Sequence, residues 1–188
     1  MKKKSIISNS IVLAIILGVY YGLATRLMIK TDIHDLIRQS YNRDSSGFPL
    51  YPKRIAEFYM FKFRGNENDL ASLNDGKGLG YILAVSKDGE ADKTNRYLQF
   101  FIDKGFDINS IDGDGFALLH KAVLYNKPES VNFLLNRGAD PDVQIDMGDH
   151  SDRVGVEPID KLNALEYAIY LTEERNDDRS ALIAMLAK

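Results

Sequence analysis

The side chains best suited to metal binding gather between residues 146 and 152. His150 stands among Asp146, Asp149 and Asp152, and an imidazole beside carboxylates can hold a divalent cation. No second histidine lies in this stretch to strengthen such a site. The sequence therefore predicts a solvated acidic loop here and no metal site.

Two further segments resemble ligand-binding loops, but each lacks a residue that the chemistry needs. Residues 107–114 (DINSIDGD) suggest a calcium loop, yet Ile111 occupies a ligand position, the turn glycine is displaced and no glutamate closes the loop. Residues 76–80 (GKGLG) lack the Gly-x-x-x-x-Gly-Lys-Ser/Thr frame of a phosphate loop. We predict that both segments are turns, the second one at the start of a helix.

Covalent and acid–base catalysis also lack the residues they require. The chain contains no cysteine, which excludes a thiol nucleophile, a disulfide scaffold and a cysteine-ligated zinc site. Its serines have no histidine in a position to act as a base. We therefore predict no catalytic residue, no cofactor and no enzymatic activity. One enzyme alternative stays open, a site of unrecognised type within residues 143–162.

Charge is distributed unevenly between the start of the chain and the rest. Residues 1–24 hold three lysines and no acid, so 21 of the 24 basic side chains remain to balance 27 acidic ones, a net charge of −6. An acidic body repels phosphate backbones, and no basic stripe overrules the total. Nucleic acid is therefore not expected as a partner.

The chain begins with three lysines followed by an apolar run over residues 11–24 (IVLAIILGVYYGLA). This order is typical of a secretory signal, and Gly22 and Ala24 are small enough for cleavage after Ala24. A retained membrane anchor is the main alternative, although fourteen helical residues span only roughly 21 Å of the ~30 Å hydrocarbon core. A buried core helix is a third. Residues 1–30 are thus predicted to be a signal or anchor, and residues 31–52 a linker.

A repeat follows, with a period of 33 residues between Gly105 and Gly138. Residues 98–109 (LQFFIDKGFDIN) align with residues 131–142 (VNFLLNRGADPD), and in both an apolar helix meets a basic residue and then glycine. Glycine adopts positive φ easily and so ends a helix, while the basic residue suits the negative helix end. The pattern predicts tandem helix pairs.

A glycine-rich turn at residues 112–115 precedes a short helix containing Leu119, His120 and Ala122. Together with Gly138-Ala139-Asp140 this segment resembles the ankyrin repeat, although Ala117 and Leu118 replace that family's threonine and proline. The resemblance implies an all-α ankyrin-repeat solenoid over residues 53–188, with stacked pairs sharing one core. Its expected parts are a degenerate cap (53–77, with helices over 55–63 and 69–73), repeats (78–111, 112–142 and 163–188) and an insertion (143–162). Residues 86–96 are expected to link the first repeat's helices.

Ankyrin proteins bind other proteins through their turn tips and inner helices, so the resemblance also implies site residues. The residues expected to contact a partner are Leu83, Lys87, Asp112, Asp114, Lys121, Leu124, Tyr125, Tyr167, Tyr170 and Leu171. Exposed tyrosine and leucine supply the apolar area that a binding hot spot needs. The alternative is that these side chains pack under the insertion. His120 is expected to hydrogen-bond the turn, as the family's histidine does.

Including the segments Phe63-Arg64-Gly65 and Tyr81-Ile82-Leu83, the layout is similar to that of exported bacterial ankyrin-repeat immunity proteins of type VI secretion effectors. That resemblance implies a periplasmic protein, free or anchored to the inner membrane by residues 1–30, that inhibits a toxin such as a phospholipase effector. The alternative is an envelope scaffold that organises a membrane complex. Membrane contact is expected only through residues 1–30, if they are not cleaved.

Overall fold

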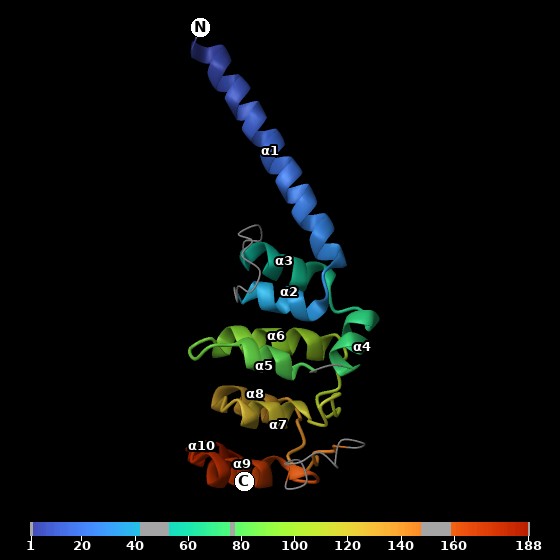
Figure 1. The fold of residues 1–188 in the computed structure, drawn as a ribbon, viewed down its shortest axis with the longest axis vertical. Helices are drawn as coiled ribbons and strands as arrows, with labels where there is room; N and C mark the ends of the chain where they lie inside the picture. Colours follow the sequence, from blue (N-terminus) through green and yellow to red (C-terminus); the bar gives the residue numbers. More distant parts are fainter. Residues whose placement is uncertain (1, 42–52, 76–77, 148–158, 188) are drawn as a thin grey trace. The chain divides into compact units, whose positions relative to one another are not determined.

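The computed structural model describes residues 2–41, 53–75, 78–147 and 159–187. Every regular element in these ranges is a helix, and the chain divides into two compact units, residues 1–64 and 65–188. Figure 1 gives the order of the helices along the chain. The prediction of an all-α protein is confirmed.

The first unit begins with α1 (Lys2–Lys30), a long helix whose apolar side chains are mostly exposed. Its segment Asn9–Lys30 has the length and hydropathy of a membrane span, a property that signal sequences and some core helices share. At 1.5 Å per residue these 22 residues reach about 33 Å, so the shortfall expected from residues 11–24 alone disappears. The helix is longer than predicted because Leu27 and Ile29 continue its apolar surface.

Residues 31–52 were expected to form a linker, and for α2 (Ile33–Ser40) this is wrong. Asp32 caps the helix by accepting a 2.8 Å hydrogen bond from the His34 backbone N–H. Ile33, Leu36 and Ile37 then fall on one face and are buried. This apolar face packs against α3 (Lys53–Phe63), so the helix forms because it has a partner. Residues 42–52 of the expected linker lie outside the described residues.

The pairing of α2 with α3 also changes the expected capping repeat. The sequence suggested that the helix over residues 55–63 would pair with a short helix at residues 69–73, but α3 packs with α2 and α1. α4 (Glu67–Asp75) belongs to the second unit. Its buried Asp69 carboxylate accepts a 2.8 Å hydrogen bond from the Gly65 backbone N–H, which fixes the start of that unit.

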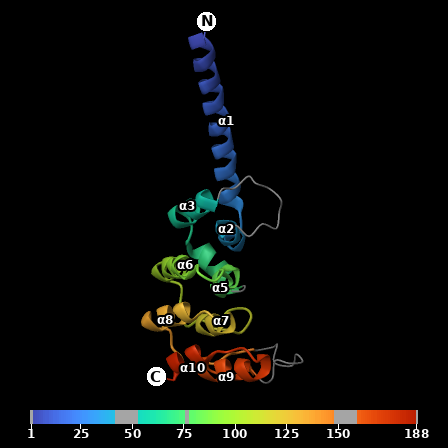
Figure 2. The same ribbon diagram turned by 90° about the vertical axis from the view of Figure 1, so that its left-hand side faces the viewer.

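The second unit stacks three helix pairs. They are α5 (Gly80–Val85) with α6 (Ala91–Asp103), α7 (Leu118–Leu124) with α8 (Pro128–Asn136), and α9 (Ala164–Arg175) with α10 (Ser180–Leu186). The inner helices α5, α7 and α9 form one column and the outer helices α6, α8 and α10 a second, as Figure 2 shows. Buried apolar residues from neighbouring pairs share one core, which confirms the ankyrin-like solenoid.

The predicted 33-residue period recurs in the backbone hydrogen bonds that end α6 and α8. Phe106 donates its backbone N–H to the Phe101 carbonyl at 3.0 Å, and Ala139 donates to Leu134 at the same distance. Gly105 and Gly138, with φ of 98° and 88°, make these Schellman turns possible.

The link between the first repeat's two helices is shorter than expected. It comprises residues 86–90, because α6 begins at Ala91, and residues 91–96 add helical turns to α6. Thr94 is buried within these added turns, so packing extends the helix. The corresponding link in the second repeat comprises residues 125–127.

Candidate protein-binding surface

The turn that precedes α7 is shaped by Asp112, one of the residues expected to contact a partner. Its carboxylate accepts hydrogen bonds from the backbone N–H groups of Asp114 at 2.9 Å and Phe116 at 3.1 Å. Gly115, at φ +89°, donates its own N–H to the Asp112 carbonyl at 2.9 Å. Asp112 is therefore occupied in holding the turn, whereas Asp114 presents a half-exposed side chain at the tip.

Lys121 points from α7 into this turn rather than outward, which corrects the expectation that it faces a partner. Its Nζ lies 3.3 Å from the Asp112 carboxylate and 2.8 Å from that of Asp114, and the Lys121 and Asp112 side chains are only 5% and 7% exposed. Burial raises the pKa of Asp112, an effect that Lys121 partly offsets. Gly80 makes room for the lysine stem, since a Cβ there would lie 2.5 Å from Lys121 Cγ.

The inner helices bury more of their surface than the sequence predicted. Leu83, Tyr167 and Leu171, all expected to face solvent, are almost fully buried. The physical reason is that these helices are short and have neighbours on several sides. α7 contacts α5, α8 and α9, and its residues from Leu118 to Val123 are all buried. A helix packed on three sides leaves little of its surface for a partner.

Part of the inner column stays accessible, including Leu124, Tyr125 and Tyr170, which we name the tyrosine surface. Tyr125 is 38% exposed, and the other two are half-buried. The buried ring of Tyr167 stacks on that of Tyr170, with 6.5 Å between centroids. Burial raises the Tyr167 pKa to about 12, and both Tyr125 and Tyr170 act on its hydroxyl in the same direction.

His120 lies beneath this surface and differs from its predicted role. Its ring packs edge-on against Phe116 and Tyr167, with centroids 6.5 and 6.1 Å away. Neither ring nitrogen makes a hydrogen bond among the described residues, so the expected bond to the turn is absent there. Burial lowers the His120 pKa to about 4, and the nearby Leu162 backbone opposes this shift without reaching hydrogen-bond geometry. The imidazole acts as a neutral packing group.

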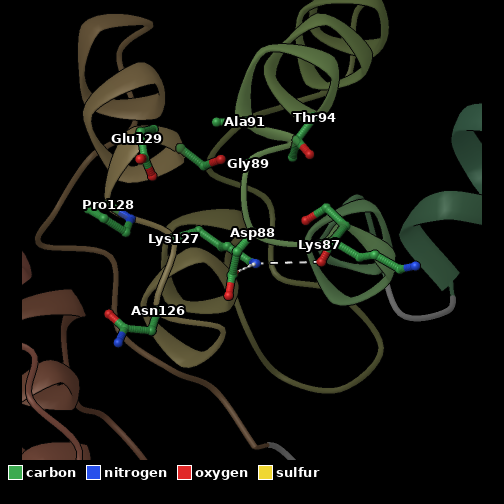
Figure 3. Close-up of a pocket in the computed structure, with 11 residues that line it drawn as sticks. Lys87, Asp88, Gly89, Ala91, Thr94, Asn126, Lys127, Pro128 and Glu129 are labelled. Atoms are coloured by element: carbon green, nitrogen blue, oxygen red, sulfur yellow. Dashed lines mark hydrogen bonds and ion pairs between the residues drawn. The ribbon is translucent and has the colours of Figure 1, made fainter. Parts of the chain in front are cut away.

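A polar groove of about 320 Å³ runs between the two inner-to-outer links, and we name it the link groove. Lys87, predicted from the sequence, lines it together with Asn126 and Lys127 (Figure 3). Lys127 closes one side by donating to the Asp88 carboxylate at 3.0 Å and to the Ser86 carbonyl at 3.5 Å. The groove offers side-chain donors and acceptors beside the start of α8, a setting suited to polar contacts with a polypeptide.

Arg179 is an important residue that sequence reasoning missed. Its buried guanidinium donates to the Val123 carbonyl at 2.5 Å and to the Leu124 carbonyl at 3.3 Å, the last carbonyls of α7. Asp177, 2.9 Å away, balances its charge. Arg179 thereby fixes the end of α7, where Tyr125 lies. The acidic neighbour was a signal for an ion pair, but nothing in the sequence placed the arginine against α7.

The described ends of the expected insertion pair with each other. Ile145 is buried, donates its N–H to the Leu162 carbonyl, and accepts from the Lys161 N–H, both at 2.9 Å. Asp146 forms an ion pair with Lys161 at 3.0 Å. His150, Asp149 and Asp152, the candidate cation ligands, lie outside the described residues. Over the ranges that the structure describes, no group of three metal-binding side chains comes together.

The turn before α7, α7 itself and α8 make up one helix pair of the second unit. Residues 114–146 match the ankyrin repeat. This match supports the resemblance drawn from Leu119, His120 and Ala122, and it makes protein binding the expected role of the ankyrin-like unit. No curated protein and no solved structure matches the chain.

Proposed function

We propose that this chain is a protein-binding ankyrin module of the bacterial cell envelope, and that it inhibits a toxin acting in the periplasm. The observation that carries protein binding is the ankyrin repeat over residues 114–146 with the tyrosine surface beside it. Tyrosines with an apolar ring and a polar tip are enriched where proteins bind each other. The buried rings of Tyr167 and Phe116 keep that surface rigid, which lowers the entropy lost on binding.

An envelope location is supported by α1. Three lysines precede its apolar segment, an order that keeps the amino terminus in the cytoplasm and directs the following residues across the membrane. Two functions of an ankyrin-repeat protein fit this location: inhibition of a toxin as an immunity protein, and organisation of a complex as a scaffold. We favour immunity against a toxin such as a type VI secretion phospholipase effector because the layout is similar to that of exported ankyrin immunity proteins.

The first experiment tests the tyrosine surface with a matched pair of variants. Tyr125→Ala and Tyr170→Ala should each weaken capture of the envelope partner, measured with purified partner by calorimetry, by about tenfold or more. Ile169→Ala is the control, because Ile169 is as exposed (40%) as Tyr125 (38%) but projects about 100° around α9 from Tyr170. Unchanged affinity in both tyrosine variants would show that the partner binds elsewhere.

A second experiment separates the two roles. Deletion of an immunity gene should make cells sensitive to toxin-delivering siblings, and the wild-type protein should restore survival where Tyr125→Ala with Tyr170→Ala does not. Deletion of a scaffold gene should instead disturb cell shape in pure culture, with no dependence on siblings. Normal survival among siblings combined with altered shape would reject the inhibitor in favour of the scaffold.

A further inference from the structure

The outward face of α3 carries an unusual combination of side chains for an acidic protein. Arg54, Phe58 and Lys62 follow each other at intervals of four residues and are all exposed. Residues at this spacing form one row along a helix. Phe58 is 62% exposed, and Phe63, at the end of the helix, is 55% exposed and contacts Phe58 edge-on at 6.3 Å between centroids. Two large aromatic rings thus stand in solvent between basic groups.

The charges of this face are those that an anionic surface attracts. α3 carries Lys53, Arg54 and Lys62 against one acid, Glu57, which is half-buried. Beside α3, Asp35 of α2 is paired with Arg38 at 2.6 Å, and Asp32, which caps α2, leaves one negative charge against the net +2 of α3. The positive character of α3 is therefore not cancelled by the helix packed beneath it.

α3 is joined to the end of α1, the apolar helix. Arg64, directly after α3, donates to the Thr31 carbonyl at 2.8 Å and to the Met28 carbonyl at 3.5 Å. Ala24 and Met28, in the last turns of α1, are buried. Within this unit α3 lies crosswise to α1 near its end (Figures 1 and 2). If α1 spans a bilayer perpendicular to its plane, a helix held crosswise at its end would lie along the bilayer surface.

From these observations we propose that α3 is an interfacial helix that docks on an anionic lipid bilayer through Arg54, Phe58, Lys62 and Phe63. Aromatic rings favour the level of the lipid headgroups, and basic side chains bind anionic lipids there. This inference rests on the part of the proposed function that places α1 in a membrane. It extends membrane contact beyond residues 1–30 and sets the orientation of the first unit on the bilayer.

Tryptophan substitutions in the full chain test the proposal, because the chain contains no tryptophan and each variant then carries one reporter. Phe58→Trp protein is placed in nanodiscs whose lipids are brominated near the headgroup end of the acyl chain. Its fluorescence should be quenched by these lipids. Tyr21→Trp, in the middle of α1, reports insertion of α1 through quenching by deeply brominated lipids. Tyr125→Trp, an exposed aromatic position in the second unit, supplies the comparison.

Charge provides the second measurement. Arg54→Gln with Lys62→Gln in the Phe58→Trp background should weaken docking on phosphatidylglycerol nanodiscs by about 25-fold, about fivefold for each positive charge removed. Both positions are exposed, so circular dichroism should remain that of the parent protein. Quenching that persists undiminished in this variant would overturn the role of the basic residues.

The outcomes distinguish the two levels of inference. Quenching at Tyr21→Trp without quenching at Phe58→Trp overturns interfacial docking and leaves the anchored protein-binding module intact. Quenching at neither position overturns both membrane anchoring and docking. Quenching at Phe58→Trp above that at Tyr125→Trp, together with quenching at Tyr21→Trp, supports docking. Quenching at Phe58→Trp without quenching at Tyr21→Trp overturns the proposal, because its geometry requires α1 to span the bilayer.

Discussion

Lys121→Met removes an ammonium group from the interior of the ankyrin-like unit while keeping an unbranched stem in the space beside Gly80. The Asp112 carboxylate, 7% exposed, then lies buried without the cation that was 3.3 Å away. Breaking a buried pair in this way costs about 3–5 kcal/mol. Two backbone N–H groups still donate to Asp112, which places the expected loss near the lower bound, about 3 kcal/mol. The half-exposed partner Asp114 adds at most about 1 kcal/mol.

Urea unfolding of the detergent-solubilised full chain, followed by circular dichroism, measures this loss. With a slope of about 1.5 kcal/mol per M, the midpoint should fall by about 2 M. Adding Asp112→Asn to Lys121→Met should recover most of the shift. The asparagine carries no buried negative charge, and its side-chain oxygen still accepts the backbone hydrogen bonds of the turn. Lys87→Met, at an exposed position, is the control and should leave the midpoint unchanged.

Acid should narrow the gap between Lys121→Met and the parent protein. Burial already raises the pKa of Asp112 in the folded state, and removing Lys121 raises it further. A carboxyl whose folded pKa lies above its unfolded value gains stability as pH falls, because the folded state binds the proton more readily. A midpoint within 0.3 M of the parent at pH 7 (roughly 0.5 kcal/mol), or a gap that widens on acidification, would refute this account of Lys121.

Three further outcomes follow from single contacts. Arg179→Met should lower the free energy of unfolding by about 2–3 kcal/mol, because it leaves the buried Val123 carbonyl without its charged donor. Thermal unfolding measures this loss, with Asp177→Asn as the comparison. Gly115→Ala should lower the free energy of unfolding by about 2 kcal/mol, because residue 115 has a φ of +89° and its new Cβ would lie 2.5 Å from the Asp146 carbonyl oxygen. In Gly105→Ala the new Cβ meets nothing within 4 Å, so this variant measures the cost of the positive φ alone. His120 titrates at about 4 when folded against 6.5 unfolded, so wild-type stability should fall by about 2 kcal/mol between pH 7.5 and pH 5, and His120→Leu should flatten this slope. A parallel slope in the variant would contradict burial of the neutral imidazole.

The helix pairs were predictable because their signals are local. The 33-residue spacing of Gly105 and Gly138 depends on a backbone conformation that glycine adopts easily, so residue type and structure correspond directly. α2 was predictable in principle, since Asp32 before the Ile33, Leu36 and Ile37 pattern is a helix-start signal, but the turn-forming residues that follow it suggested a linker.

The exposed face of the inner helices was not predictable in the same way. Whether Tyr167 or Tyr170 faces solvent depends on what packs beside α9. The sequence shows only two tyrosines three residues apart, and nothing in it tells which one is buried. Lys121 illustrates the same limit, since a lysine is normally exposed. Its burial depends on a turn seven or more residues earlier and on the space at Gly80, which meet it only in three dimensions.

The matching hydrogen bonds at the ends of α6 and α8 have a consequence for how this molecule can change in length. Phe106 to Phe101 and Ala139 to Leu134 are the same junction made twice, and Asn109 bridges them by donating to the Gly138 carbonyl and accepting from the Asp140 N–H. A duplication of residues 106–138 would place Phe106 of the new copy five residues after Leu134, the same spacing that joins Phe106 to Phe101 and Ala139 to Leu134. The stack of helix pairs could therefore be extended by whole 33-residue repeats without a new type of junction between them.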